Sequence, residues 1–379
     1  MRRTPLALLN LLHERTRLVV AIAGVAFAVL LIFMNLGFQG ALLASTTIMY
    51  DQIDADIFLV SPQSLEISST KAFPRERLYQ VAGVEGVARV MPLYMEYLLW
   101  RNPDTRLSRA MFVFAINPQD PVFKMPELRT ADAIAALQRP NTVFIDRRSR
   151  SEFGPQTTGL ETEADRRRVT IGGQYTLGGG FAADGTLIMS DQNFRRFFAP
   201  RPLSLISMGL VQLVPGTDAN QVVATMRTRL PPDVRVLTKA DMVASDRQFW
   251  QENTAIGFIF GLGVAVSFIV GIVIVYQILY TDIRDHLREY ATLKAMGYGS
   301  RYLFQIVLQE SIILAILGYI PGLLISVALY DLTFRATQLP IAMNPGRILS
   351  VLLLTIFMCS VSGLVSVRRA VTADPADVF

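Results

Sequence analysis

The sequence predicts a membrane protein with four transmembrane α-helices and a large extracytoplasmic α+β domain between the first and second helices. Of the 379 residues, 51% are hydrophobic and only 18% are charged, and the mean hydropathy is +0.37. A soluble domain usually carries about 25% charged residues. The apolar residues are also unevenly placed, because they gather near residue 20 and beyond residue 254. The long segment between these regions has a mixed composition and is expected to fold as a domain of its own.

Four stretches are long and apolar enough to cross a bilayer, whose core of about 30 Å needs roughly 20 helical residues. The expected spans are residues 18–44, 254–281, 302–330 and 348–367. Only the third span contains a charged side chain, which is Glu310 near its start. A cleaved signal peptide fits the first stretch poorly, because the apolar run is longer than the roughly 7–15 residues typical of such peptides and no A-x-A site follows it.

Lysine and arginine in the short loops predict the orientation of the spans. Residues 1–17, the 282–301 loop and the tail 368–379 together hold ten of these residues, whereas the 331–347 loop holds two. Both termini and the 282–301 loop are therefore expected in the cytoplasm, as in a multi-pass protein of the inner (plasma) membrane. Residues 45–253 would then lie outside, where 24 basic and 23 acidic residues nearly cancel. The net charge of +5 reflects this topology, and no nucleic-acid partner is expected.

The segments around the spans complete the predicted layout. Residues 1–17 are expected to form a cytoplasmic amphipathic helix in the membrane interface, 331–347 a short extracytoplasmic loop and 368–379 a cytoplasmic tail. At the two ends of the extracytoplasmic domain, residues 45–53 and 239–253 predict helical extensions of the neighbouring spans. These extensions would form a stalk for the domain.

The extracytoplasmic domain, residues 45–253, predicts two β-α-β units separated by an insertion. The first unit consists of a strand at 56–61, a helix at 74–81 and one or two strands within 87–100. The second unit consists of a strand at 208–214, a helix at 218–230 and a strand at 234–238. The insertion, roughly 118–200, is expected to be less regular. Within it, the charged patch 161–168 is interpreted as a solvated loop, and the glycines at 172–180 as turns or an edge-strand connection rather than a nucleotide-binding loop.

No arrangement of residues typical of catalysis or metal binding stands out. His13 and His286 are the only histidines, Cys359 is the only cysteine, and none has partners at ligand spacing. The chain is therefore not expected to be an enzyme or to bind a metal. Glu310 is a candidate functional residue because charged groups inside membrane spans usually have a role. A structural role has similar weight, since negative charge is stabilised near a helix N-terminus.

The loop 282–301 is the most informative segment. Ile283, Leu287 and Tyr290 follow helical spacing between charged side chains, and Gly297 suits the end of a helix. A short helix between two spans can lie on the bilayer or dock into a partner's groove. Its mixed charges argue against simple attraction to anionic lipid, which requires clustered lysine and arginine.

This loop resembles the "REIATLKALG" element of the MacB/FtsX-type ABC transporter permease family, in which the element couples the permease to its ATPase. In that family the following span also opens with an acid, here Glu310, and the chain ends in an R-x-A…DP tail, here within 368–379. The start at Thr4-Pro5 and the strand that follows Asp54 make the DevC-like branch, with no fused ATPase, the most similar. The residues that the resemblance assigns to ATPase coupling are Arg288, Glu289, Tyr290, Ala291, Thr292, Leu293, Lys294, Ala295, Met296 and Gly297.

The resemblance implies a permease subunit of an efflux system that works by mechanotransmission. It implies a homodimer with a separate ABC ATPase subunit, which would bind ATP and Mg²⁺ while this chain binds no cofactor. It also implies a periplasmic adaptor, an outer-membrane channel and lipid-like or peptide-like cargo. Gly257-x-x-x-Gly261 in the second span could permit close contact between helices. The alternatives are a permease for lipoprotein release or control of cell-wall hydrolases, and a membrane receptor or scaffold that transports nothing.

Overall fold

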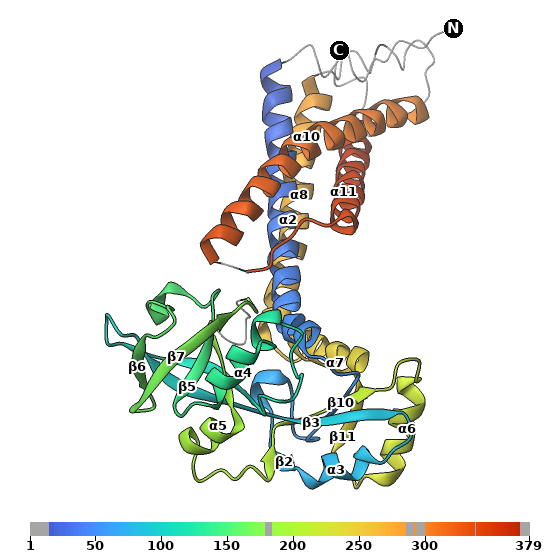
Figure 1. Ribbon diagram of the computed structural model, residues 1–379. Coiled ribbons are helices and arrows are strands. Elements are labelled where there is room, and N and C mark those ends of the chain that lie inside the picture. Colours follow the sequence, from blue (N-terminus) through green and yellow to red (C-terminus); the bar gives the residue numbers. More distant parts are fainter. Residues whose placement is uncertain (1–14, 179–183, 286–291, 293–299, 338, 372–379) are drawn as a thin grey trace. The chain divides into compact units, whose positions relative to one another are not determined.

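The computed structural model describes residues 15–178, 184–285, 292, 300–337 and 339–371 (Figure 1). The chain divides into two compact units, and each is described by itself. The membrane unit comprises residues up to Ala41, residues 255–337 and residues from Ile341 onward. The other unit, residues 42–254 together with Gln338–Pro340, is called the interspan domain.

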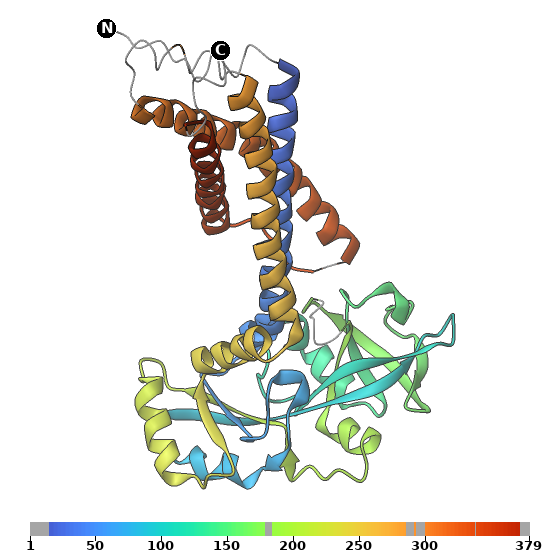
Figure 2. The ribbon, with the colours of Figure 1, turned by 180° about the vertical axis from the view of Figure 1, so that it is seen from behind.

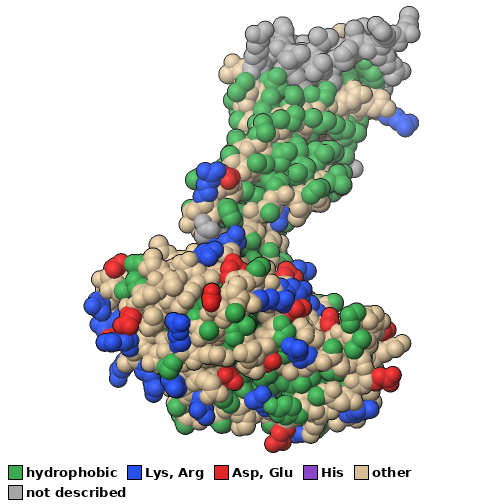
Figure 3. All heavy atoms as spheres, viewed as in Figure 1, with side chains coloured by type: hydrophobic (Ala, Val, Ile, Leu, Met, Phe, Trp, Pro, Cys, Tyr) green, Lys and Arg blue, Asp and Glu red, His purple; other side chains and the backbone are tan. Residues whose placement is uncertain are grey.

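Four long helices form the described part of the membrane unit. They are α2 (Arg15–Gln52), which continues into the interspan domain, α8 (Ala255–Asp285), α10 (Ser300–Thr337) and α11 (Pro345–Val371). In the described part of the chain these four are long and apolar enough to cross a membrane, which confirms the predicted number of transmembrane helices. Hydrophobic side chains cover much of the face of these helices that Figure 3 shows. Residues 331–337, expected in a loop, are the last two turns of α10.

Small residues allow the membrane helices to approach one another closely. A Cβ added to Gly322 of α10 would come within 2.8 Å of Val29 of α2, so the two helices are in contact here. Hydroxyl and amide groups add polar links between helices. The Ser362 hydroxyl of α11 donates to the Ile272 carbonyl of α8 (3.0 Å), and the Asn35 amide of α2 donates to Ser267 Oγ of α8 (3.2 Å).

The interspan domain contains the two predicted β-α-β units, and their strands interleave in one sheet. The first unit is β1 (Ile57–Val60), α3 (Glu76–Ala82) and β3 (Val87–Arg101). The second is β10 (Met208–Leu213), α6 (Ala219–Arg229) and β11 (Arg235–Thr238). The strand order is β11-β1-β10-β3, with antiparallel neighbours throughout. This is the arrangement of a split β-α-β, or ferredoxin-like, sheet.

Both faces of this sheet are covered by helices, which explains why its strands are apolar on both sides. Ile57 and Leu59 belong to the same core as α3 and α6, and Figures 1 and 2 show these helices on one face. Phe58 and Val60 point the other way, because successive side chains alternate along a strand. They belong to a second core with the end of α2 and with α7 (Lys239–Glu252).

The insertion is a folded subdomain of strands and helices, whereas residues 118–200 were expected to be less regular than the two units. The second half of β3 starts a further sheet with the order β3-β4-β8-β5-β7-β6, and β6 pairs again with β3 at Trp100 and Arg101. The sheet therefore closes on itself as a small barrel. The strands and helices that it adds are β4 (Ser108–Ile116), α4 (Ala131–Gln138), β5 (Thr142–Asp146), β6 (Glu161–Ala164), β7 (Arg167–Tyr175), β8 (Thr186–Ser190) and α5 (Asp191–Phe197).

The charged patch 161–168 is a β-hairpin of this barrel and not a loop. Glu161–Ala164 pair with Arg167–Thr170, and Asp165 and Arg166 form the turn with positive φ angles of 46° and 63°. The charged residues of β6 suggested a loop, but their side chains lie on the solvated outer face of the strand. Thr162 and Ala164 alternate with them and are buried. Gly172 and Gly173 lie within β7, and Gly178 (φ 109°) follows it.

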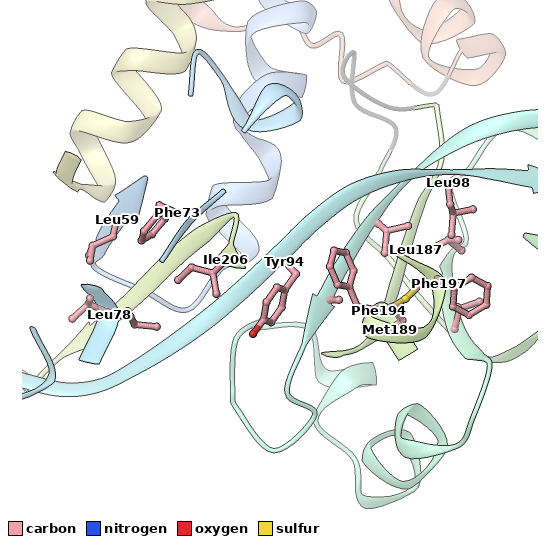
Figure 4. Close-up of a cluster of buried hydrophobic side chains, with 14 of the residues drawn as sticks. Leu59, Phe73, Leu78, Tyr94, Leu98, Leu187, Met189, Phe194, Phe197 and Ile206 are labelled. Carbon is pink, nitrogen blue, oxygen red and sulfur yellow. The ribbon is translucent and has the colours of Figure 1, made fainter. Parts of the chain in front are cut away.

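One core runs through both sheets without interruption. Figure 4 shows Tyr94 between Ile206 and its neighbours on one side and Phe194 on the other. Tyr94 is completely buried, its ring centroid lies 5.3 Å from that of Phe194, and its hydroxyl donates to the Leu203 carbonyl (2.9 Å). The two sheets are therefore packed as one domain rather than as two linked domains.

Candidate functional site

The segment assigned to ATPase coupling lies almost entirely outside the described residues. Helix α8 ends at Asp285 and α10 begins at Ser300, and between them only Thr292 is described, as an exposed helical residue. The roles of residues 288–297 therefore stay predictions. The amphipathic helix expected at 1–17 and the tail 372–379 also lie outside the described residues, apart from the first turn of α2.

Glu310 is completely buried inside the membrane unit. It lies ten residues after the start of α10, which corresponds to about 15 Å along the helix. Its neighbour Ser311 faces α11, where a Cβ on Gly363 would overlap the serine hydroxyl. The carboxylate is therefore inside the helix packing and does not lie on the lipid-facing surface of the described helices.

Gly261, one of the two glycines singled out on the second span, does not serve packing within the chain in the way that its neighbours do. A Cβ added to Gly261 would meet no atom within 4 Å. In contrast, the space beside Gly263 and Gly271 of the same helix is occupied by the side chains of Asn35 and Met358. The side chains around Gly261 are exposed, with Phe258 at 70% and Leu262 at 51%. This face of α8 is free for contact with lipid or with another chain.

A second site, which the sequence did not predict, joins the end of α2 to α7 inside the interspan domain. The hydroxyl of Tyr50 donates a 2.7 Å hydrogen bond to Oδ2 of Asp246. Both residues are buried, at 0% and 1% exposure. The sequence signal for this pair is weak, because 196 positions separate the two residues and neither belongs to a motif.

Further hydrogen bonds hold the end of α2 in place. Nζ of Lys239, the first residue of α7, donates to the Ile53 carbonyl (3.0 Å). The carboxylate of Asp54 forms an ion pair with Arg129 (2.7 Å), and its carbonyl accepts from Gln212 (2.8 Å). Ile53 and Asp54, the two residues that follow α2, are therefore bonded to α7, to the ferredoxin-like sheet and to the segment that precedes α4.

Burial sets the protonation behaviour of this site. The pKa of Asp246 is raised to about 7, mainly by burial, and the nearby carboxylate of Glu66 contributes to the increase. The hydrogen bonds from Tyr50 and from the Ile67 N–H, together with the charge of Arg235, act in the opposite direction. Desolvation also lowers the pKa of Lys239. In the described part of the chain no three His, Cys, Asp or Glu side chains lie close enough together to hold a metal ion.

Comparison with known proteins places both units in one family. Residues 18–229, more than half of the chain, match the MacB-like periplasmic core domain, and residues 254–375 match the FtsX-like permease C-terminal family. An uncharacterized ABC transporter permease of Mycobacterium tuberculosis, from strains CDC 1551 and H37Rv, is 21% identical over 380 aligned positions that cover 98% of each chain.

Two solved structures are similar to about half of this chain. The extracellular domain of the ABC-type transporter YknZ from Gram-positive bacteria is 14% identical, with a TM-score of 0.34, over 48% of this chain and 99% of that chain. The periplasmic region of MacB from Actinobacillus actinomycetemcomitans is 9% identical, with a TM-score of 0.35, over 50% of this chain and 91% of that chain. On the two family matches, which together extend from the first span to the last, the chain belongs to the MacB/FtsX family of ABC transporter permeases.

Proposed function

We propose that this chain is the permease subunit of an ABC-type exporter and that it transmits movement of a separate ATPase to the interspan domain. The observation that carries the proposal is the position of residues 288–297, which resemble a coupling element and lie between the second and third helices of an FtsX-like membrane unit. In this mechanotransmission no cargo passes between the helices of the permease. ATP and Mg²⁺ are bound by the partner ATPase, and this chain binds no cofactor.

The proposal includes a defined orientation. Both termini and the 282–301 loop lie in the cytoplasm, and the interspan domain lies outside the inner membrane. The support is the excess of lysine and arginine in the loops assigned to the cytoplasm. In a Cys359→Ala background, a membrane-impermeant maleimide should label Gln80→Cys in intact spheroplasts and should label Arg284→Cys only after lysis. Labelling of Arg284→Cys in intact cells contradicts this orientation.

The proposal also includes a second copy of the chain. The open face around Gly261 of α8 suits close contact between two identical helices. Replacing Gly261 by Leu should reduce the dimer fraction measured by cross-linking in native membranes. Val273→Leu, at an exposed position (56%) on the same helix, is the matched control and should leave the dimer fraction unchanged. If the dimer fraction is unchanged in Gly261→Leu, the two copies are in contact through another face.

Adaptor, outer-membrane channel and cargo complete the proposed efflux system. A periplasmic adaptor would contact the interspan domain, and cargo of lipid-like or peptide-like chemistry would leave through the channel. The support is the match of residues 18–229 to the MacB-like periplasmic core domain. A lipoprotein-release permease or a regulator of cell-wall hydrolases would use the same coupling with different partners.

The deciding experiment is an affinity purification of the tagged chain from mild detergent, in which mass spectrometry identifies the partners. The test variant combines Glu289→Arg and Leu293→Asp in the coupling segment. The control variant is Arg335→Ala, which removes an exposed ion pair with Asp331 (2.8 Å) far along α10. An ABC ATPase should accompany the native chain and the control and should be lost from the test variant.

Two results would contradict the proposal. If no ATPase accompanies the native chain, the receptor or scaffold function takes its place. If the ATPase is retained by the test variant, residues 288–297 are not the coupling element. An adaptor that co-purifies with all three proteins would support the efflux system, and a periplasmic lipoprotein carrier or a cell-wall hydrolase would support the alternatives within the family.

A further inference from the structure

The Tyr50–Asp246 hydrogen bond connects the two helices through which the interspan domain is attached to the rest of the chain. Tyr50 lies in the last turn of α2, the helix that contains the first transmembrane segment. Asp246 lies in the middle of α7, and α8 with the second transmembrane segment begins three residues after α7 ends.

We propose that the Tyr50–Asp246 contact is a coupling pin, which makes the end of α2 and helix α7 move together when the permease changes shape. This inference rests on the proposed function, since it specifies how movement of the membrane helices reaches the interspan domain. Asp246 is in this sense a positioning residue, and it has no contact with cargo or ATP.

Two attachment points restrict how α7 is oriented relative to the C-terminal end of α2 and to Ile53, the residue that follows it. Lys239 holds the Ile53 carbonyl at the start of α7, and Asp246 holds Tyr50 seven residues later, which corresponds to about 10 Å along α7. One point alone would allow α7 to swing about it. Two points prevent this rotation, so a displacement of α2 is passed to α7 with little loss.

A buried carboxyl group is an unfavourable way to fill space, which argues that the contact is more than packing. An apolar pair of the same volume would avoid the desolvation of a carboxyl group and often stabilises a protein more. A hydrogen bond has a direction and a fixed length, whereas apolar side chains slide past one another. The pin therefore gains geometric definition at the expense of stability.

The charge of the pin depends on groups from each element that faces it. Tyr50 approaches from α2, Glu66 from the segment before the short 3₁₀ helix Ile67–Ser69, and Arg235 from β11. The Ile67 N–H also donates to Asp246. When Asp246 ionises, a second negative charge is buried near Glu66, so the site becomes less stable. Ionisation also strengthens the hydrogen bond from Tyr50, so the coupling should change as the pH rises through neutrality.

The experiment uses the full chain with its co-purified ATPase in lipid nanodiscs. A spin label at Ala224→Cys, an exposed position of α6, in the Cys359→Ala background reports the distance between two copies. The shift in this distance on addition of ATP and vanadate measures the coupling. ATP hydrolysis is measured in parallel, because a broken pin should leave hydrolysis intact.

The expected results separate the pin from general stability. Tyr50→Phe removes one oxygen atom and should reduce the distance shift at least twofold, and Asp246→Leu should do the same. Asp246→Asn can still accept from Tyr50 but cannot titrate, so it should keep the shift and lose its dependence on pH between 6 and 8. Tyr94→Phe removes a buried hydroxyl that bonds to Leu203 elsewhere in the domain, and this control should keep the full shift.

Each contrary result has a separate meaning. If the native complex hydrolyses ATP without any distance shift, the proposed function fails and the pin fails with it. If the native complex shows the shift and Tyr50→Phe keeps all of it, the pin alone is wrong. If Asp246→Asn shows the same pH dependence as the native chain, another group controls the coupling and Asp246 has a structural role only.

Discussion

Gly322 of α10 lies so close to Ala26 of α2 that a Cβ on the glycine would be 2.9 Å from the Ala26 carbonyl oxygen. The obstacle is backbone, which cannot rotate away as a side chain can. Contact between helices in a membrane depends on such close approach, because apolar side chains gain little by leaving lipid.

Gly322→Ala should therefore destabilise the membrane unit by about 1–3 kcal/mol, since overpacking pushes the two helices apart. The measurement is the apparent Tm of the full chain in detergent, followed by loss of the monodisperse peak in size exclusion. Gly346→Ala is the control, because its added Cβ would meet only Asn344 at an ordinary 3.6 Å. Equal Tm values for the two variants would show that α2 and α10 separate without cost.

Asn193 should be the most sensitive polar residue of the barrel. Its Nδ2 donates to the carbonyls of Arg139 (3.0 Å) and Thr142 (3.1 Å), and its Oδ1 accepts from the Asn141 N–H (2.9 Å). Asn193→Asp turns the donor into an acceptor that faces carbonyl oxygens, so we expect a loss of about 2–4 kcal/mol. Urea-dependent proteolysis of the full chain measures this loss.

The control for this substitution is Asn220→Asp, the same change at an exposed position near the N-terminus of α6. Negative charge is favourable at a helix N-terminus, so this variant should stay within about 0.5 kcal/mol of the native chain. Comparable losses in both variants would mean that the added charge, and not the lost donor, is responsible.

Replacing either of two adjacent arginines of the β6–β7 hairpin by glycine should change the stability of the domain, but in opposite directions. Arg166 has a φ of 63° in the turn, a conformation that glycine adopts without steric cost. Arg166→Gly should therefore stabilise the domain by about 0.5–1 kcal/mol. Arg167 opens strand β7, so Arg167→Gly should destabilise the domain by a similar amount. The same proteolysis assay reports both. Destabilisation in both variants would indicate that the Arg166 side chain has a role of its own.

The raised pKa of Asp246 predicts a dependence of stability on pH. The pKa is about 7 in the folded chain and about 3.8 ordinarily, so the folded state binds more protons between these values. The contribution of Asp246 to stability is therefore present at low pH and is lost as the pH rises through this window. Asp246→Asn removes this term, so its stability relative to the native chain should increase between pH 4.5 and 8, by a few kcal/mol at most. A constant difference across this range would indicate an ordinary pKa.

Local patterns were sufficient to predict the spans and the two β-α-β units, although not the interleaving of their strands in one sheet. The spans need only length and apolar composition, and the two units alternate strand and helix over short distances. Within β1, for example, Ile57 to Val60 form one apolar run between polar residues. The coupling segment was found through its resemblance to a family motif, and its structure lies outside the described residues.

Long-range pairing explains what the sequence did not predict. The barrel depends on contacts such as Trp100 with Ala164 and Phe112 with Thr186, which no local pattern encodes. Polar outer faces also concealed β6 and β7. Tyr50 and Asp246 belong to no motif and are separated in the sequence by almost the whole interspan domain. Their contact is therefore evident only from the fold.

Strand β3 has a consequence for how the interspan domain breaks. Val87 to Leu93 pair with β10 in the first sheet, and Tyr94 to Arg101 pair with β4 in the barrel. Removing the insertion would leave the backbone of the second half of β3 unpaired and would expose Leu98 and Trp100. The barrel is therefore not a module that can be removed or transferred to another protein. Force applied to either sheet is also transmitted to the other sheet through the continuous backbone of β3. The domain should therefore unfold under force in a single event.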